Sequence, residues 1–176
     1  MNLPKKTHPT IIIGIDPGLN ITGWGVISFY NNALTPLAYG TITSQPKAPF
    51  PERLKILHQE LSTILKTHTP DVAAIEKTFV NSNPTSALKL SMARGVILLA
   101  PAQQAIPVFE YAATCIKKTV VGVGHATKDQ VALMTKKLLP NIGTVKKDAA
   151  DALAIAICHA HHQNILKYTY LARASV

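Results

Sequence analysis

The chain has 176 residues, of which 47% are hydrophobic and 15% charged, a composition that excludes intrinsic disorder and allows one sizeable core. Its most apolar run, residues 96–100, is too short to cross a bilayer, and the first residues lack the apolar stretch of a signal peptide. Lysine and arginine (18) outnumber aspartate and glutamate (9), which gives a net charge of +9. We therefore expect a cytoplasmic protein without a membrane partner, and either a polyanionic ligand or a generally basic surface.

Three strands are predicted at the start of the chain. Residues 10–15 form a β-branched run that ends in a turn beginning at Asp16. A second strand follows at residues 22–30, and a turn at residues 31–32 leads into a third strand at about residues 37–43. Strands joined by such short connections predict an antiparallel meander.

Helices and strands alternate in the middle of the chain. Apolar side chains recur on one helical face over residues 52–67, and a buried strand at residues 72–75 ends at Glu76. The next helix, residues 85–100, is apolar around most of its circumference, and a fifth strand is predicted at residues 107–111. Such a helix must be covered on several sides, by the core or by a second subunit.

The last third of the chain is predicted to be helical and basic. A short helix at residues 113–118 and a glycine-bearing loop at residues 120–125 precede a helix whose start is marked by the capping-box spacing of Thr127 and Gln130. The final helix is predicted at residues 148–159. Between positions 117 and 147 there are seven lysines and one acidic residue, so we expect a basic surface here.

Together these elements predict an α/β protein with a five-stranded mixed sheet flanked by helices. No internal repeat or linker divides the sequence, so we expect one domain over residues 1–176. Within it, residues 1–9 would be a short N-terminal extension and residues 164–176 a mobile tail.

Acidic side chains are placed where such a fold gathers ligands. Asp16 and Glu76 end two strands, and both carboxylates emerge at one sheet edge if these strands are parallel neighbours. Asp148 and Asp151 are three residues apart, so they share one face of the last helix. Gathered carboxylates need a cation, and an all-oxygen ligand set favours Mg²⁺. Two such ions about 3.5–4 Å apart can hydrolyse a phosphodiester without a protein nucleophile.

Each of these acids also has a simpler interpretation. Asp16 can belong to an ordinary turn, and Glu76 can be a solvated strand end. Asp148 and Asp151 suit the positive end of a helix dipole. Only the combination of gathered acids with a basic surface favours a metal-dependent enzyme that acts on phosphodiesters.

The cysteines and the C-terminal histidines are not predicted to form a site. Cys115 and Cys158 have no metal-ligand spacing in the sequence and are expected to be two reduced thiols. His159, His161 and His162 lie a helical turn or more beyond Asp151 and are expected to be solvated.

Five segments of the chain resemble, in the same order and spacing, the RuvC family of Holliday-junction resolvases. The resemblance runs nearly end to end, and it is carried by residues 13–18 with 22–26, 74–79, 86–90 with 93–95, 117–122 and 148–154. It implies a ribonuclease-H-like fold and a crossover junction endodeoxyribonuclease, active in DNA recombination and repair. Such an enzyme cuts two opposed strands of a four-way junction symmetrically, as a homodimer.

The resemblance also implies roles for individual residues. Lys117 and Lys128 match basic residues near the scissile phosphate, and we expect Lys118 to bind DNA beside them. Phe79 matches an aromatic residue that stacks on a base at the junction centre, although without the resemblance it would be assigned to the core. Catalysis and metal binding fall to four acidic residues that match the family one for one, which we call the four acids: Asp16, Glu76, Asp148 and Asp151.

The implied cofactor is Mg²⁺, two ions per active site, for which Mn²⁺ would substitute. The implied partners are four-way junction DNA, a second copy of the chain bound through the helix at residues 85–100, and a branch-migration helicase complex of the RuvA and RuvB type. Pro101 departs from the family pattern, in which it would lie inside a helix, and it predicts a kink or an early helix end.

Three other functions fit parts of the sequence. ATPases of the actin/hexokinase type begin with a similar strand–Asp–Gly hairpin, but they pair two such domains, and the sequence contains no second hairpin of this kind. A catalytically inactive junction-binding protein is disfavoured because all four acids are present. A related nuclease of the same fold with a different nucleic-acid substrate remains as the alternative.

Overall fold

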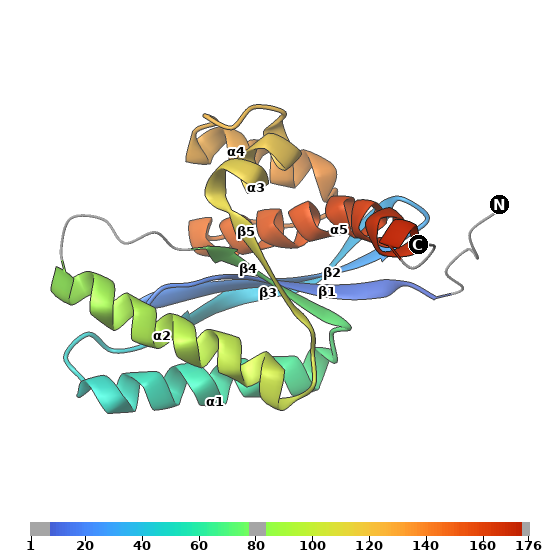
Figure 1. Ribbon diagram of the computed structural model, residues 1–176. Helices are drawn as coiled ribbons and strands as arrows, with labels where there is room; N and C mark the ends of the chain where they lie inside the picture. Colours follow the sequence, from blue (N-terminus) through green and yellow to red (C-terminus); the bar gives the residue numbers. More distant parts are fainter. Residues whose placement is uncertain (1–7, 78–83, 174–176) are drawn as a thin grey trace.

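The computed structural model describes residues 8–77 and 84–173. Two helices, α1 and α2, cover one face of a sheet, and α3, α4 and α5 cover the other (Figure 1). The predicted five-stranded mixed sheet flanked by helices is confirmed, with strand order β3-β2-β1-β4-β5. In chain order the elements are β1 Thr10–Asp16, β2 Ile21–Tyr30, β3 Ala33–Thr43, α1 Phe50–His68, β4 Val72–Lys77, α2 Pro84–Gln103, β5 Val108–Ala112, α3 Ala113–Val121, α4 Lys128–Leu138 and α5 Lys147–Arg173.

The sheet joins an antiparallel meander to two parallel strands. β1 pairs antiparallel with β2, and β2 with β3, through a two-residue turn in which Asn31 and Asn32 both have positive φ (49° and 63°). That backbone matches the twist of a tight hairpin. β3 therefore starts at Ala33, earlier than predicted, and its Pro36 is tolerated because β3 is an edge strand. On the other side β1 pairs parallel with β4, and β4 with β5.

The central strand β1 is buried on both faces. Ile13 and Ile15 pack with α1 and α2 in one hydrophobic core, whereas Ile12 packs with α3, α4 and α5 in the other. All three side chains are fully inaccessible to solvent (0% exposed). This double burial explains why the strand reads as a continuous apolar run rather than an alternating one.

The first half of α5 packs directly on the backbone of β1 and β2. A Cβ atom at Gly14 would overlap the carbonyl oxygen of Ala152, and one at Gly23 would overlap the carbonyl oxygen of Asp148. The facing helix residues are small as well, since Ala152 and Ala156 are completely buried. Glycines on the sheet and alanines on the helix thus bring the start of α5 into contact with the end of β1.

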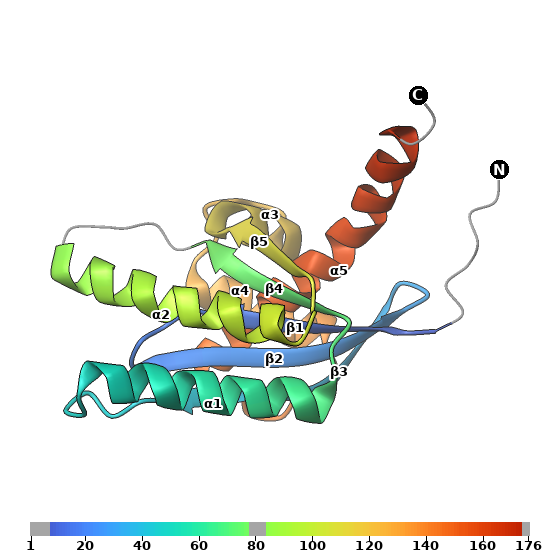
Figure 2. The same cartoon turned by 60° about the horizontal axis from the view of Figure 1, so that its bottom comes forward.

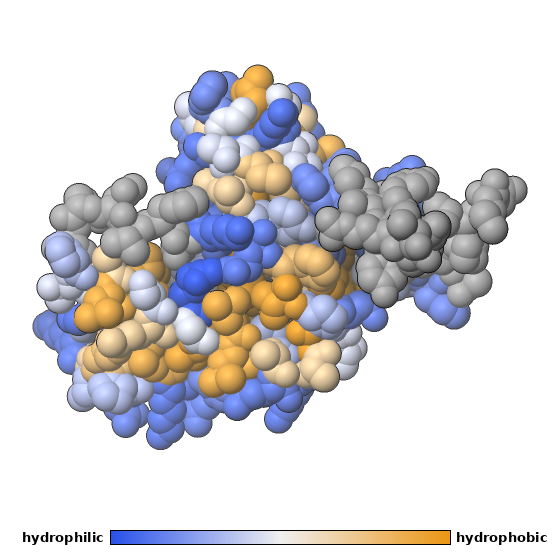
Figure 3. All heavy atoms as spheres, viewed as in Figure 1, coloured by the Kyte–Doolittle hydropathy of each residue, from blue (hydrophilic) through white to orange (hydrophobic). Residues whose placement is uncertain are grey.

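Helix α2 carries two opposite apolar stripes. Ala93, Ile97 and Ala100 are buried against the core (0% exposed). The other stripe consists of Leu88, Met92, Gly95 and Leu99, whose spacing places them on one face, and its three large side chains are 58%, 45% and 50% exposed. Figure 3 shows apolar residues gathered over this helix. Pro101 lies in the last turn of α2, which ends two residues later at Gln103, as the proline predicts.

The C-terminal helices differ from the prediction in length. α3 continues to Val121, so the predicted loop begins only at Gly122, a C-cap with φ of 95°. The capping box of Thr127 and Gln130 is confirmed at the start of α4. α5 continues to Arg173 and extends beyond the sheet (Figure 2), so residues 164–173, expected in a mobile tail, are helical. Residues 160–173 contain no glycine or proline to end the helix. Within the described chain, no helix is long and apolar enough to cross a membrane.

We predict that Gly23→Ala destabilises the protein, because the new methyl group would push the start of α5 away from the sheet. The expected loss is about 1–3 kcal/mol in the free energy of unfolding, the usual effect of overpacking. Gly143→Ala is the matched control, since the nearest atom to its Cβ would be the Tyr39 hydroxyl oxygen at an ordinary 3.7 Å. Thermal melts of both variants measure the difference, and equal stabilities would contradict the packing described for α5.

Candidate active site

Strand pairing places Asp16 and Glu76 next to each other. Asp16 is the last residue of β1, and Glu76 is the last but one of β4. The two strands are parallel neighbours with Ile15 opposite Ile75, so the residues that follow this pair leave the sheet side by side. The parallel pairing on which the predicted site depends is therefore present.

The packing of α5 brings the other two acids to the same edge. Gly23 is the β2 residue paired with Asp16, and the backbone of Asp148 lies directly against Gly23. Asp148 is thus positioned over the end of β1, with Asp151 one helical turn further along α5. The four acids come from three elements, and the carboxylates of Glu76, Asp148 and Asp151 are close enough to Asp16 to interact with it electrostatically.

The electrostatics of Asp16 and Glu76 reflect this crowding. Burial raises the pKa of Asp16 to about 7, and the carboxylates of Glu76, Asp151 and Asp148 add to the increase. Burial also raises the pKa of Glu76, followed by repulsion from Asp151. These carboxyl groups therefore hold protons more tightly than isolated ones, and a cation would relieve the repulsion.

Lys128 supplies a positive charge to this cluster. Its Nζ atom donates a hydrogen bond to Oδ2 of Asp151 at 3.1 Å, and this contact raises the pKa of the lysine. The same ammonium group partly opposes the increases in the pKa of Asp16 and of Glu76, because its positive charge favours the ionised carboxylates. The lysine side chain is 77% exposed and that of Asp151 only 18%, so the ammonium group reaches the acids from the solvent side.

The other two lysines predicted to bind DNA, Lys117 and Lys118, lie in different surroundings. Lys117 lowers the pKa of Glu76, so it too stands beside the acids. Lys118 instead lines a pocket shared with Cys115, His125 and His162, which contains none of the four acids. Phe79, the predicted base-stacking residue, lies outside the described residues.

The four acids fit a hard divalent cation by their donor chemistry, since all their ligand atoms are oxygens. Their spacing is wider than that of a closed metal site. Across residues 8–77 and 84–173, the one group of three potential ligands with donor atoms within 4.8 Å of one another is formed by other residues, Cys115, Cys158 and His162. The Lys128 ammonium group contacts one of the four acids, Asp151, from the solvent side.

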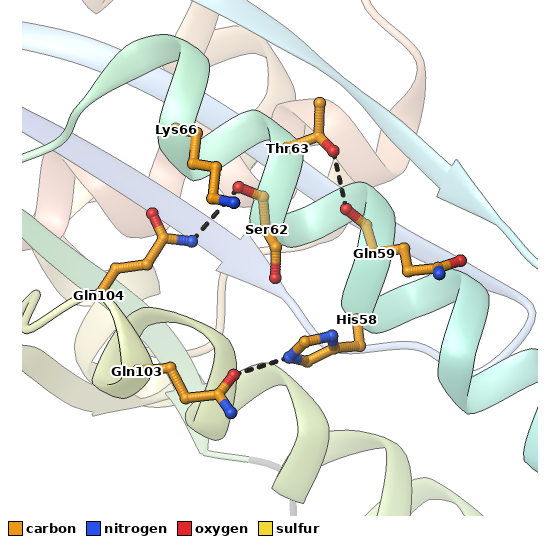
Figure 4. Close-up of a pocket in the computed structure, with 7 residues that line it drawn as sticks. All are labelled: His58, Gln59, Ser62, Thr63, Lys66, Gln103 and Gln104. Atoms are coloured by element: carbon orange, nitrogen blue, oxygen red, sulfur yellow. Dashed lines mark hydrogen bonds between the residues drawn. The ribbon is translucent and has the colours of Figure 1, made fainter.

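A pocket between α1 and α2 does not belong to this site. Figure 4 shows that the side chains of His58 and Gln103 are hydrogen-bonded across it (2.8 Å), as are the Gln104 amide and the Ser62 carbonyl oxygen (3.2 Å). Its lining includes no acidic residue and no residue predicted to act in catalysis. It also lies on the face of the sheet opposite α5.

The prediction that the C-terminal histidines are solvated is wrong for two of them. His159 is buried (3% exposed), and its Nδ1 atom is hydrogen-bonded to the Tyr111 hydroxyl group at 2.8 Å. His162 is half-buried and contacts both cysteines. The error has a physical cause: His159 packs against Tyr111 of β5, and α5 continues past the predicted end at residue 159, so that His162 packs against Cys115 of α3. The four-residue spacing of Cys158 and His162 was the signal in the sequence, because such residues share a helical face.

The chain is similar to known proteins over nearly its whole length. Residues 12–159, which include the four acids, match the model of a family described as crossover junction endodeoxyribonuclease RuvC. The enzyme of that name from Granulibacter bethesdensis is 53% identical over 160 residues, 91% of this chain and 90% of the relative. That of Paramagnetospirillum magneticum is 53% identical over 152 residues, 86% and 92% of the two chains.

Solved structures agree with this result. Thermus thermophilus RuvC superposes with a TM-score of 0.81 and 30% identity, over 89% of this chain and 96% of the other. The same protein in complex with a Holliday junction substrate gives a TM-score of 0.82. The yeast mitochondrial resolvase Ydc2, 16% identical with a TM-score of 0.68, shares the fold. These likenesses confirm the predicted ribonuclease-H-like fold.

The raised pKa of Asp16 predicts a pH-dependent cost in stability. The folded value of about 7 lies above that of an unfolded aspartate, which is about 3.9. Between these two values the folded chain binds more protons than the unfolded chain, so stability falls as the pH rises and the full cost is present above pH 7.

Asp16→Asn should therefore raise the Tm in EDTA near neutral pH, on the order of a few degrees for a chain of this size. The gain should shrink as the pH falls from neutral and should disappear well below about 3.9, where the wild-type carboxyl group is protonated in both states. Thermal melts over this pH range measure it. A gain of the same size at every pH would show that Asp16 is not a strained carboxylate.

Proposed function

Since the chain belongs to the RuvC family of crossover junction endodeoxyribonucleases, we propose that the four acids form the metal-binding active site of a Holliday-junction resolvase. The observation that carries the assignment is the meeting of Asp16 and Glu76, at the ends of neighbouring parallel strands, with the acidic face of α5. The protein is a metal-dependent nuclease, and its substrate is four-way junction DNA.

The chemistry of the proposed site follows from its donors. Two Mg²⁺ ions, or Mn²⁺ in their place, would supply activation of the attacking water and charge neutralisation at the leaving oxygen. Asp16 has to lose its proton to act as a ligand, and a nearby cation makes this loss easier by lowering the raised pKa of the carboxyl group. Such a mechanism needs no protein nucleophile.

Lys128 has a second task in this proposal. In the protein alone its ammonium group neutralises Asp151. When divalent cations take over that role, the exposed lysine is free to reach a phosphate oxygen of the strand to be cut. We propose that Lys117, whose charge lowers the pKa of Glu76, holds the neighbouring phosphate. We propose that Lys118 and Phe79 also bind the junction, as the family resemblance implies.

We propose a homodimer formed through the exposed stripe of α2. Leu88, Met92 and Leu99 leave a row of apolar side chains in solvent, and Gly95 between them has no atom within 4 Å of its Cβ position. A row of this kind, with a small residue at its centre, allows a second helix to approach closely. A twofold dimer would present two active sites to the two opposed strands of a junction.

Family membership alone supports three further proposals. We propose that residues 1–176 act as a single nuclease domain, that the enzyme works in the cytoplasm, and that a branch-migration helicase complex of the RuvA and RuvB type delivers its substrate. A nuclease of the same fold with a different nucleic-acid substrate is the alternative.

We predict that Asp16→Asn abolishes cleavage and leaves junction binding nearly unchanged, because it removes a metal ligand and no phosphate contact. The loss should exceed about 100-fold, since even groups that only support metal ligands contribute up to that factor. A labelled four-way junction and a linear duplex of the same sequence, each with Mg²⁺ and with EDTA, give the measurement. Cleavage by the variant at the wild-type rate would refute the site, and equal cutting of the duplex by the wild type would favour the alternative substrate.

Lys117→Ala should weaken both cleavage and the salt dependence of junction binding. The slope of log affinity against log salt should become shallower by about one unit for each phosphate that the variant no longer binds. Lys66→Ala is the matched control, because Lys66 lines the pocket on the opposite face of the sheet and its replacement removes the same charge. Equal slopes for the two variants would place Lys117 away from the DNA.

Met92→Glu should break the proposed dimer. A central interface residue contributes on the order of 1–2 kcal/mol, so the dissociation constant should rise about tenfold or more. Leu133→Glu is the control, because Leu133 is also an exposed apolar residue (56%, against 45% for Met92) but lies on α4. Light scattering across a dilution series gives the mass of each variant, and a Met92→Glu protein that stays dimeric would exclude this face.

A further inference from the structure

A second group of potential metal ligands lies between α3 and α5, apart from the four acids. Cys115, Cys158 and His162, here called the thiol–imidazole cluster, place their donor atoms within 4.8 Å of one another. Cys115 Sγ is 3.7 Å from His162 Nε2, and Cys158 Sγ is 3.7 Å from Nδ1 of the same ring. Both cysteines are free thiols.

These separations suit a zinc ion. With Zn–S bonds of about 2.3 Å and Zn–N bonds of about 2.0–2.1 Å, a sulfur and a nitrogen at two corners of a tetrahedron are about 3.6 Å apart. The separation between Cys115 Sγ and His162 Nε2 is close to this value, and the two sulfur atoms lie within 4.8 Å of each other, so side-chain rotations would complete the arrangement. Two thiolates would balance the charge of a divalent ion despite the neighbouring Lys118.

The tautomer of His162 also favours binding. Its Nδ1 atom lies 2.8 Å from the carbonyl oxygen of Cys158. A carbonyl oxygen only accepts hydrogen bonds, so Nδ1 carries the proton and Nε2 keeps a lone pair, directed at Cys115. Metal-binding histidines are commonly held in this way, with the second ring nitrogen donating to a carbonyl group.

The cluster is also reachable from solvent. Cys115, Thr119 and His162 line an open pocket of 560 Å³ together with His125 of the loop before α4. Cys158 is fully buried behind them and donates a weak hydrogen bond to the Thr119 hydroxyl oxygen at 3.6 Å. Three protein ligands would thus face a fourth coordination position on the pocket side.

We propose that the thiol–imidazole cluster binds one thiophilic divalent ion such as Zn²⁺ and thereby clamps α3 to α5. Both thiols lose their protons when the ion binds, so one Zn²⁺ replaces two H⁺. The clamp would join the helix that carries Lys117 to the helix that carries Asp148 and Asp151. The ion would therefore fix the relative positions of these two helices and would not contact the reacting phosphate.

The test uses the full chain, reduced and freed of metal, and titrated with Co²⁺ in excess Mg²⁺. A thiolate–cobalt charge-transfer absorption that saturates at one ion per chain, and that Zn²⁺ abolishes on displacing the cobalt, is the expected result. The four acids cannot produce this absorption, because they offer only oxygen ligands. Zn²⁺ should also raise the Tm of the wild-type protein.

Variants of the partly exposed ligands keep the test independent of folding. Cys115→Ser and His162→Gln should weaken cobalt binding by about 100-fold or more. Removing a group that only supports a metal ligand already costs up to about 100-fold, so removing a ligand itself should cost at least as much. His161→Gln, a change of the neighbouring exposed histidine, should bind as the wild type does. The proposal is wrong if the wild type shows no thiolate absorption, if Cys115→Ser keeps it, or if the two thiols form a disulfide while the reduced protein binds no metal.

Discussion

Direct packing of a helix on the backbone of the sheet is the constraint on which the site depends. Without side chains at Gly14 and Gly23, α5 sits so close to β1 and β2 that the carbonyl oxygen of Asp148 touches the sheet. A larger residue at either position would lift the helix and carry two of the four acids away from the other two. The geometry of the site is therefore determined by residues that take no part in its chemistry.

The close packing also brings carboxylates together at the end of β1, where their repulsion lowers the stability of the folded protein. Carboxyl groups from three elements are held in a partly buried place, and the pKa of Asp16 rises to about 7 as a result. Lys128 moderates the repulsion without filling the site, because its ammonium group reaches in from solvent. The free energy of unfolding is thus lowered at the proposed cation site, a compromise between stability and activity that is common at active sites.

Local patterns predicted most of the elements, whereas the gathering of the four acids was expected only on the condition that β1 and β4 are parallel neighbours, and from the family resemblance. The hydrophobic run of β1, the capping box at Thr127 and the turn at Asp16 are all local signals. The packing of α5 against β5 and α3, which are distant from it in the chain, could not be predicted from the sequence. The contact of His159 with Tyr111 depends on how α5 packs on β5, and the approach of Cys115 to His162 depends on how α3 packs along α5. No spacing within one segment reports either arrangement.

The order of the elements along the chain has a consequence for the nascent protein. All five strands are complete by Ala112, whereas the acids of α5 lie at positions 148 and 151, in the final element. A ribosome adding about 5–20 residues per second needs seconds to synthesise the chain between the end of β5 and the acids of α5. An unfinished or prematurely terminated chain therefore lacks Asp148 and Asp151, two of the four acids, and cannot assemble the proposed site.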